Sequence, residues 1–263
     1  MINKIIKNHP KGVYFGSKLP NTEFMPTNAG RKYRHEIKIL LSHGEYLSFS
    51  ARLKTVVSPD RYSMENGDYF IRSLYLDDIY NTAYTTKIAG TDNRKKYRIR
   101  CYNGSKDVIK FECKNKYKDR IHKISFPITY EQYIMFMDGK YDFLTDIKHP
   151  LAKEVYGLIK RSGLSPSVIV DYDREAYVHP LSNTRLTFDK NLRSVINSYD
   201  IFNDNICSLP VFDNRSVIFE IKYDEFIPAH IVEMIASLRG TKMSLSKFCM
   251  CKDKLLEVKK YDI

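Results

Sequence analysis

Short runs of alternating apolar and polar residues begin at Tyr33 and recur through most of the chain. Alternation with a period of two is typical of β-strands, because successive side chains of a strand point to opposite faces. Asn103 and Gly104, which separate two of these runs, predict a hairpin turn. The pattern predicts eight strands, over residues 33–41, 69–76, 94–102, 107–117, 120–127, 167–178, 184–189 and 217–224.

Helix signals interrupt the strands at four places. Residues 42–45 and 129–132 each carry the capping-box pattern, a Ser or Thr followed three residues later by Glu or Gln. Residues 150–163 and 228–240 each have Pro at their start and Gly at their end, as helices often do. Eight antiparallel strands with a few flanking helices predict an α+β fold, in which the strands form a barrel or a strongly curved sheet.

The domain organisation is expected to be simple. Residues 1–30 carry three prolines and three glycines without periodicity, which predicts an irregular lead-in. No change in composition divides the remainder, so residues 31–263 are interpreted as one domain. Within it, residues 190–215 are rich in Asn, Asp and Ser and are interpreted as a loop that crosses the barrel.

Cysteine use and hydropathy bear on the compartment. Five cysteines without regular spacing argue against a disulfide framework. The pair Cys249 and Cys251 could bind a metal, but no second Cys or His pair lies nearby, which favours packing. No stretch approaches the roughly 18 consecutive apolar residues of a membrane span. We therefore expect a cytoplasmic protein.

Charge composition points to an anionic partner. Lys and Arg number 43 against 31 for Asp and Glu, a formal net charge of +12. Such an excess suits a nucleic acid, a membrane surface or a polyanionic small molecule. The usual nucleic-acid-binding motifs are missing from the sequence, so no specific nucleic-acid partner is expected.

The charges are concentrated on one face of several predicted strands. In residues 94–100 every even position is Arg or Lys, and a Glu-x-Lys pattern recurs at 36–38, 112–114 and 220–222. The polar face of a sheet ordinarily lies in solvent. However, four cations on one face of one strand repel one another unless an anion lies between them. A barrel with this face inside would be a basic tunnel with a few carboxylates, suited to a polyphosphate and a Mg²⁺ or Mn²⁺ ion.

Eight motifs occur in order along the chain: Tyr33–Lys38, Ser73–Asp77, Arg94–Arg100, Phe111–Lys114, Asp171–Glu175, Arg185–Asp189, Phe219–Lys222 and Ser244–Phe248. Together they give the sequence a resemblance to the VTC domain of the triphosphate tunnel superfamily, over about residues 31–250. The resemblance implies an eight-stranded antiparallel β-barrel, the triphosphate tunnel. It also implies a metal-dependent polyphosphate polymerase that transfers the γ-phosphate of ATP onto a growing polyphosphate chain.

The resemblance also implies site residues. Glu220 would hold a Mn²⁺ or Mg²⁺ ion, and Lys222 would bind substrate beside it. No protein nucleophile is required, because phosphoryl transfer rests on positioning and charge neutralisation. Seven cations would bind phosphate and act in catalysis: Lys38, Arg98, Arg100, Lys114, Arg174, Arg185 and Lys247.

Four of these residues also have a simpler interpretation. Arg174 could form a surface salt bridge, Arg185 could pair with Asp189, and Glu220 could merely neutralise Lys222. Lys247 could be a solvated cation in a loop.

One departure from the superfamily pattern bears on function. The superfamily signature Glu-x-Glu-x-Lys reads here Arg34-x-Glu36-x-Lys38, which favours the VTC branch over hydrolytic relatives. We expect ATP and polyphosphate or triphosphate as ligands. A triphosphatase that hydrolyses ATP, inorganic triphosphate or an RNA 5′ end, and a non-catalytic polyphosphate-binding module, stay open. Recruitment by a membrane-protein partner and the oligomeric state also stay open.

Overall fold

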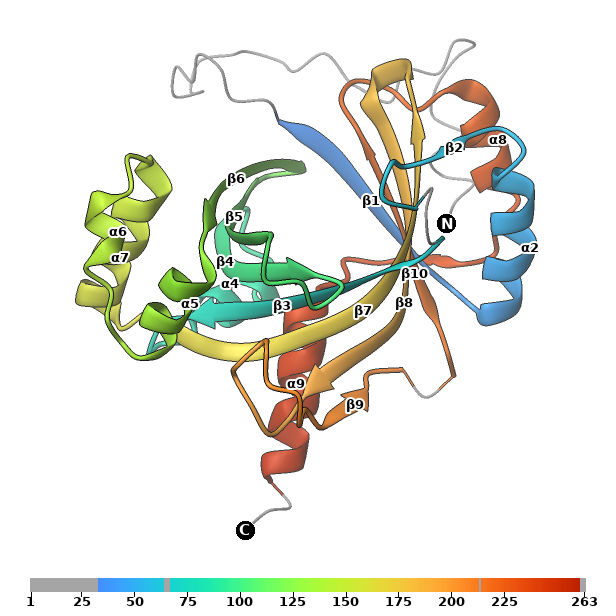
Figure 1. The fold of residues 1–263 in the computed structure, drawn as a ribbon. Helices are drawn as coiled ribbons and strands as arrows, with labels where there is room; N and C mark the ends of the chain where they lie inside the picture. The colour runs from blue at the N-terminus through green and yellow to red at the C-terminus, as the bar shows by residue number, and fades with distance from the viewer. Residues whose placement is uncertain (1–32, 64–66, 213, 261–263) are drawn as a thin grey trace.

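Eight strands are hydrogen-bonded edge to edge into a closed antiparallel ring in the computed structural model, which describes residues 33–63, 67–212 and 214–260 (Figure 1). These strands are β1 (Arg34–Leu41), β3 (Tyr69–Asp77), β4 (Asn93–Tyr102), β5 (Ile109–Tyr117), β6 (Arg120–Ile128), β7 (Ser165–His179), β8 (Thr184–Val195) and β10 (Val217–Tyr223). Their order is β7-β3-β4-β5-β6-β1-β10-β8, and β8 pairs again with β7. The predicted α+β fold with eight antiparallel strands is confirmed.

Three short strands extend this sheet, and one of them corrects a prediction. They are β2 (Ser58–Pro59), β9 (Ser208–Pro210) and β11 (Thr241–Lys242). The prediction of a loop over residues 190–215 was wrong at both ends, since β8 continues to Val195 and β9 pairs with it. A bulge at Asn191, whose φ is +50°, breaks the alternation of apolar and polar residues. The part of β8 after the bulge therefore does not show the pattern of a strand in the sequence. The predicted lead-in over residues 1–30 lies outside the described residues, and the single domain over 31–263 stays a prediction.

The described residues form seven α-helices. The capping boxes at residues 42–45 and 129–132 are both present and start α2 and α5. Gly163 ends α7 as predicted, whereas α8 ends at Ala236, before Gly240. The helices are α2 (His43–Leu53), α4 (Thr82–Ile88), α5 (Tyr130–Met137), α6 (Phe143–Asp146), α7 (Pro150–Ser162), α8 (Ala229–Ala236) and α9 (Lys247–Lys259).

Apolar residues on the outer face of the ring pack beneath helices on opposite sides of the molecule (Figure 1). Odd-numbered residues of β4 and β5, such as Ile99 and Phe111, are fully buried with residues of α5, α6 and α7. Odd-numbered residues of β1 and β10, such as Ile39 and Phe219, pack against α2 and α8. Because alternate side chains of a strand point in opposite directions, the charged even-numbered residues face the ring interior.

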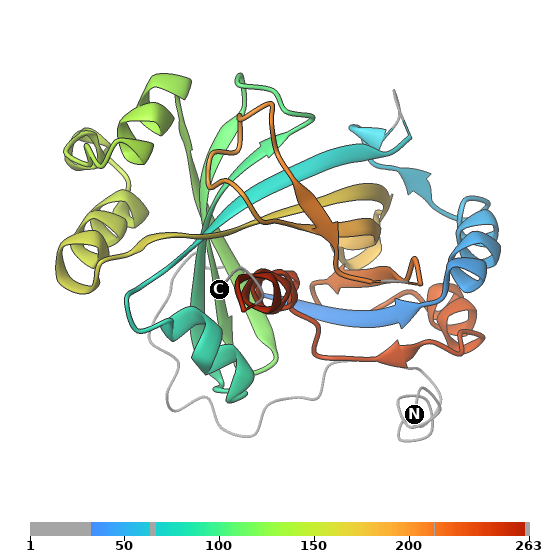
Figure 2. The same ribbon diagram turned by 90° about the horizontal axis from the view of Figure 1, so that it is seen from below.

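The C-terminal helix α9 packs on the inner face of the ring near one end. In Figure 2 it is seen almost end-on between the two halves of the sheet. Phe248 stacks on Tyr75 of β3 with ring centroids 5.1 Å apart, and Ser194 of β8 donates a hydrogen bond to the Cys251 carbonyl at 2.7 Å. This helix was not predicted, because the buried Lys247 and Lys252 interrupt its apolar pattern. Its first residue, Lys247, is thereby placed inside the ring.

Gly240, in the segment before α9, lies very close to β1. A Cβ at Gly240 would lie 2.6 Å from the Leu40 carbonyl oxygen and 2.6 Å from Leu41 Cδ2. We expect Gly240→Ala to lower the free energy of unfolding by about 1–3 kcal/mol, since backbone must shift to relieve the overlap. Urea denaturation measures this effect. The matched control is Gly44→Ala in α2, where nothing lies within 4 Å, and it should be neutral or stabilise by up to about 1 kcal/mol. Equal unfolding midpoints for the two variants would contradict the close approach.

Candidate functional site

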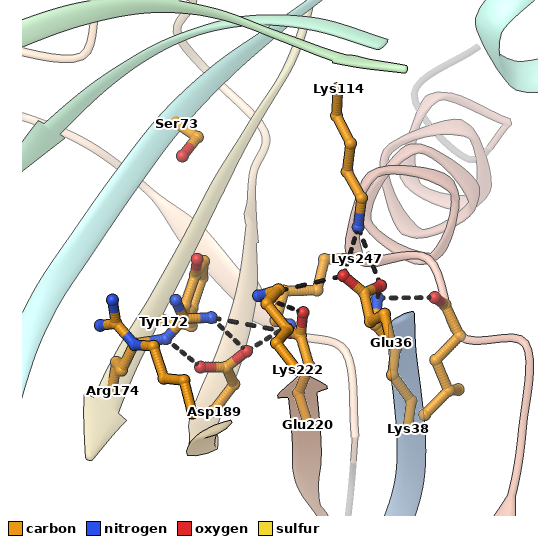
Figure 3. A network of polar contacts seen from close by, with 12 residues as sticks. Glu36, Lys38, Ser73, Lys114, Tyr172, Arg174, Asp189, Glu220, Lys222 and Lys247 are labelled. Atoms are coloured by element: carbon orange, nitrogen blue, oxygen red, sulfur yellow. Dashed lines mark hydrogen bonds and ion pairs between the residues drawn. The ribbon is translucent and has the colours of Figure 1, made fainter. Parts of the chain in front are cut away.

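Charged side chains from several strands and from α9 meet inside the ring (Figure 3). Lys38 and Lys114 both pair with Glu36, at 3.1 and 2.7 Å. Lys222 pairs with Glu220 at 2.5 Å. Across β1 and β10, Lys38 lies opposite Glu220 and Lys222 opposite Glu36, so acids and cations alternate on this wall. The arrangement balances charges that would otherwise repel one another.

Asp189 continues this network on the next strand, β8. The Arg174 guanidinium donates two hydrogen bonds to the Asp189 carboxylate, at 2.6 and 2.8 Å. Lys247 forms an ion pair with the same carboxylate. Arg174 and Lys247 each lie 3.8 Å from a Glu220 oxygen, so Glu220 joins the two halves of the network.

A second group of charges is built around Glu112 of β5, whose side chain is 1% exposed. Arg98 pairs with Glu112 at 2.6 Å, Lys123 at 3.0 Å and Arg100 at 3.7 Å. Arg98 also donates to the Tyr75 hydroxyl at 2.9 Å. One carboxylate therefore fixes the positions of three cations on neighbouring strands.

Tyr172 of β7 connects the two groups. Its hydroxyl accepts a hydrogen bond from Arg100 at 3.1 Å. The Arg174 guanidinium carbon lies 5.3 Å and the Lys247 ammonium 5.0 Å from the centre of its ring. Cations near an aromatic face are attracted to its negative charge density. The ring thus links the Glu112 group to the Asp189 group.

The protonation states follow from burial and from these neighbours. Burial and the nearby Glu220 carboxylate raise the pKa of Glu36, but the ammonium groups of Lys114, Lys38 and Lys222 outweigh them and leave it lowered. Burial likewise raises the pKa of Asp189, but Arg174 and Lys247 bring it down to about 2. Both acids are therefore charged at neutral pH.

Lys222 behaves differently, because burial lowers its pKa to about 7 in spite of the nearby carboxylates of Glu220 and Glu36. Burial also lowers the pKa of Lys114, against the opposing effect of Glu36. The lowered pKa values of these lysines show that the neighbouring carboxylates do not fully offset the cost of burying the charged form.

The structure brings together all but one of the cations assigned by the family resemblance. Arg185 lies opposite Lys222 on the neighbouring strand but has other partners: it donates to Asp60 at 2.6 Å and to the Tyr69 hydroxyl at 2.8 Å, and its side chain is 34% exposed. Four partners were not assigned, although each stands at an inward-facing strand position that the alternation could have indicated. They are Asp189, Tyr172, Tyr75 and Lys123.

A separate pocket of about 440 Å³ lies outside the ring. It contains few of the residues named above and no carboxylate. Its lining is His43, Tyr46, Leu47, Lys190, Asn191, Arg215 and Val217.

A model of the VTC domain family matches residues 33–256. The chain belongs to the VTC domain family. The predicted membership of the VTC domain family is thereby confirmed. No curated protein sequence matches the chain.

Solved structures with some similarity to this VTC domain are distant. A Hippeastrum protein, provisionally named an adenylyl cyclase and described as having a dominant triphosphatase activity, is 11% identical, with a TM-score of 0.48 over 85% of this chain and 96% of that one. A Bacillus halodurans protein, provisionally named an adenylate cyclase, is 11% identical, with a TM-score of 0.42 over 89% and 92%. A protein from Pyrococcus horikoshii OT3 is 12% identical, with a TM-score of 0.42 over 84% and 99%. At TM-scores below 0.5 these similarities do not bear on function.

The donor chemistry of this VTC domain fits a divalent metal shared with a substrate. Within residues 33–63, 67–212 and 214–260, no three His, Cys, Asp or Glu residues group as metal ligands. Mg²⁺ is commonly bound by only one or two carboxylates together with substrate phosphates. Beside Glu220, its cross-strand neighbour Thr187 has a buried hydroxyl that lacks a hydrogen-bond partner among the described residues. Glu220 and Thr187 thus offer hard oxygen donors, provided that the Lys222 ammonium moves aside.

No helix among the described residues of this VTC domain is long and apolar enough to cross a membrane.

The partly buried ammonium group of Lys96 allows the cost of burying a charge without a carboxylate partner among the described residues to be tested as a function of pH. Burial, reinforced by the ammonium groups of Lys114 and Lys38, lowers its pKa from 10.5 to about 7. Below pH 7 it is charged in both folded and unfolded states, so the cost of burying the charge is fully present. That cost disappears as pH rises toward 10.5, because the folded state loses the proton first. We expect Lys96→Met to gain most stability over wild type below pH 7, and the gain should shrink by about 1.4 kcal/mol per unit of lowered pKa.

Denaturation at pH 6 to 10 measures this difference in unfolding free energy. The control is Lys95→Met, which removes an ammonium from the outer face of the same strand, where it pairs with Glu154 at 2.6 Å. A gain from Lys96→Met that stays constant or grows with pH would contradict the lowered pKa.

Proposed function

We propose that the chain is a metal-dependent polyphosphate polymerase that transfers the γ-phosphate of ATP onto a polyphosphate chain inside the ring. The observation that supports this most is the convergence of cations from β1, β4, β5, β7, β10 and α9 on the ring interior. A chain of phosphates is the substrate class that best matches many cations lining one interior. A cytoplasmic location and a membrane-protein partner stay predictions.

The arginines and lysines would contribute in different ways. The guanidinium groups of Arg98, Arg100 and Arg174 match two phosphate oxygens at once, and carboxylates and tyrosines already hold them in place. The four interior lysines act as compact charges, each beside a carboxylate, that add to the positive potential around the phosphates. They are Lys38, Lys114, Lys222 and Lys247.

The transfer itself requires no protein nucleophile. An oxygen of the terminal phosphate of the chain bonds to the γ-phosphorus of ATP, and the bond from that phosphorus to the β–γ bridging oxygen breaks. ADP leaves, and the chain is one phosphate longer. Fixed cations stabilise the charge that develops on the transferred group and on ADP, without reorganising during the reaction.

Glu220 is the residue proposed to hold the divalent ion, with Thr187 beside it. When bound, Mn²⁺ or Mg²⁺ supplies additional positive charge to the phosphate oxygens. Asp189 and Glu36 keep Arg174, Lys247 and Lys38 in place around it.

A triphosphatase would use the same interior, with water in place of the acceptor phosphate. Arg34 favours the polymerase, because it stands where the hydrolytic relatives carry an additional acid. Its guanidinium pairs with Asp224 at 3.1 Å and adds no carboxylate to the interior.

The reaction products test the proposal. Purified protein incubated with ATP and Mn²⁺ should yield ADP and growing chains, seen as internal phosphate signals by ³¹P NMR. Orthophosphate and ADP without internal phosphate signals would show a triphosphatase instead. Unchanged ATP would show a binding module.

Two variants separate metal-dependent transfer from phosphate binding. Glu220→Gln keeps the shape but removes the charge that a hard cation needs, so turnover should fall at least about 100-fold, or about 3 kcal/mol. Its metal-free affinity for triphosphate should survive, because a repelling carboxylate is lost. Arg98→Ala should lose both affinity and rate, since it removes a phosphate-binding guanidinium.

Calorimetry with inorganic triphosphate and initial-rate measurements with ATP provide the two readouts for each variant. Thermal unfolding shows whether both variants are folded. Undiminished metal-dependent turnover in Glu220→Gln would show that another carboxylate, such as Glu36 or Glu112, holds the ion.

A further inference from the structure

Four cations at one end of the ring differ from those of the interior in their surroundings. Lys87 lies in the last turn of α4, Arg94 and Lys96 on β4, and Lys116 on β5. All four are partly exposed. In the part of the chain that the structure describes, none of them is within ion-pairing distance of a carboxylate, whereas every interior cation is. These four residues are called the outer basic cluster.

Strand register places like charges directly opposite one another in this cluster. Arg94 lies opposite Lys116, and Lys96 lies opposite Lys114. Like charges facing each other across two strands are destabilising. The next inward pair, Arg98 and Glu112, is an ion pair at 2.6 Å. The pairing of cations with carboxylates on β4 and β5 thus stops before this end of the ring.

Residues 244–246, just before α9, bring the cluster together. Lys87 donates a hydrogen bond to the Ser244 hydroxyl at 3.0 Å, and Lys96 donates one to the Ser246 hydroxyl at 2.6 Å. Burial, reinforced by the charge of Arg94, lowers the pKa of both Lys87 and Lys116. The cations are therefore close enough to repel one another.

The cluster is continuous with the interior. Lys114, which faces Lys96, reaches inward to Glu36 at 2.7 Å. Along an extended strand, Arg94 lies roughly 13 Å from Arg98. A phosphate ligand must therefore extend well beyond the interior to contact both residues.

We propose that the outer basic cluster binds the part of a linear inorganic polyphosphate chain that extends out of the interior, beside α4. The proposal rests on the proposed function for the interior site, but it concerns binding and not transfer. A polyphosphate carries regularly spaced negative charge, which would relieve the repulsion between the facing cations. Because the cluster has no carboxylates of its own, a phosphate there displaces no ion pair.

The test compares two ligands on one variant. Arg94→Ala combined with Lys116→Ala removes two cations without leaving a carboxylate unpaired. Calorimetry without metal should show affinity for long-chain inorganic polyphosphate reduced about tenfold, and affinity for inorganic triphosphate changed by no more than about twofold. The charge-preserving pair Arg94→Lys and Lys116→Arg should restore binding of the long chain.

The control carries the same change in net charge on the outer surface. It combines Lys95→Ala with Lys153→Ala, two exposed lysines on β4 and α7. Neither affinity should change. Unaltered affinity for the long chain in the Arg94 and Lys116 variant, or an equal loss for both ligands, would overturn the proposal.

Failure of the proposed function gives a different result. If wild-type protein makes no polyphosphate from ATP but shows this pattern of affinities, transfer fails and the binding site stands. If it extends chains while the variant binds long chains normally, the binding site alone fails. A wild-type protein that binds neither phosphate would overturn both.

Discussion

Buried carboxylates hold the cations of the ring interior at contact distance, and the ligand-free protein depends on this neutralisation. Glu36, Glu112, Asp189 and Glu220 lie on four different strands, with side chains no more than 7% exposed. Removing one partner of a buried ion pair commonly costs about 3–5 kcal/mol, because the other charge is left uncompensated. A phosphate chain entering the ring would take over part of this neutralisation. Binding is then largely an exchange of anionic partners, in which the cations keep their positions.

The outer surface of the ring makes this interior possible. Apolar residues of the same strands are buried on the outer face beneath two groups of helices. The charged residues that alternate with them must therefore point to the inner face. The inner wall is not uniformly polar, since Tyr75 and Val168 pack with α9 at one end. That packing fixes the start of the helix and brings Lys247 to Asp189.

Strand alternation was enough to predict the eight strands and which charges share one face of the sheet, because both depend on local side-chain direction. The family resemblance was needed to choose between a charged interior and a solvent-facing sheet. Helix α9 could not be predicted, since its buried Lys252 pairs with Asp77 and Ser167, which are distant from it in sequence. The same holds for Arg185, whose partner proved to be Asp60 and not the Asp189 of its own strand. Long-range pairing of this kind leaves no periodic signal in the chain.

The location of a bound phosphate chain tests the central claim most directly. A crystal structure of the protein with inorganic triphosphate is predicted to show phosphorus atoms inside the ring, within hydrogen-bonding distance of Arg98, Arg174 and Lys247. The external pocket beside His43 and Lys190 provides the alternative, because it also presents cations. Triphosphate found only in that pocket, with the interior ion pairs unchanged, would contradict the account.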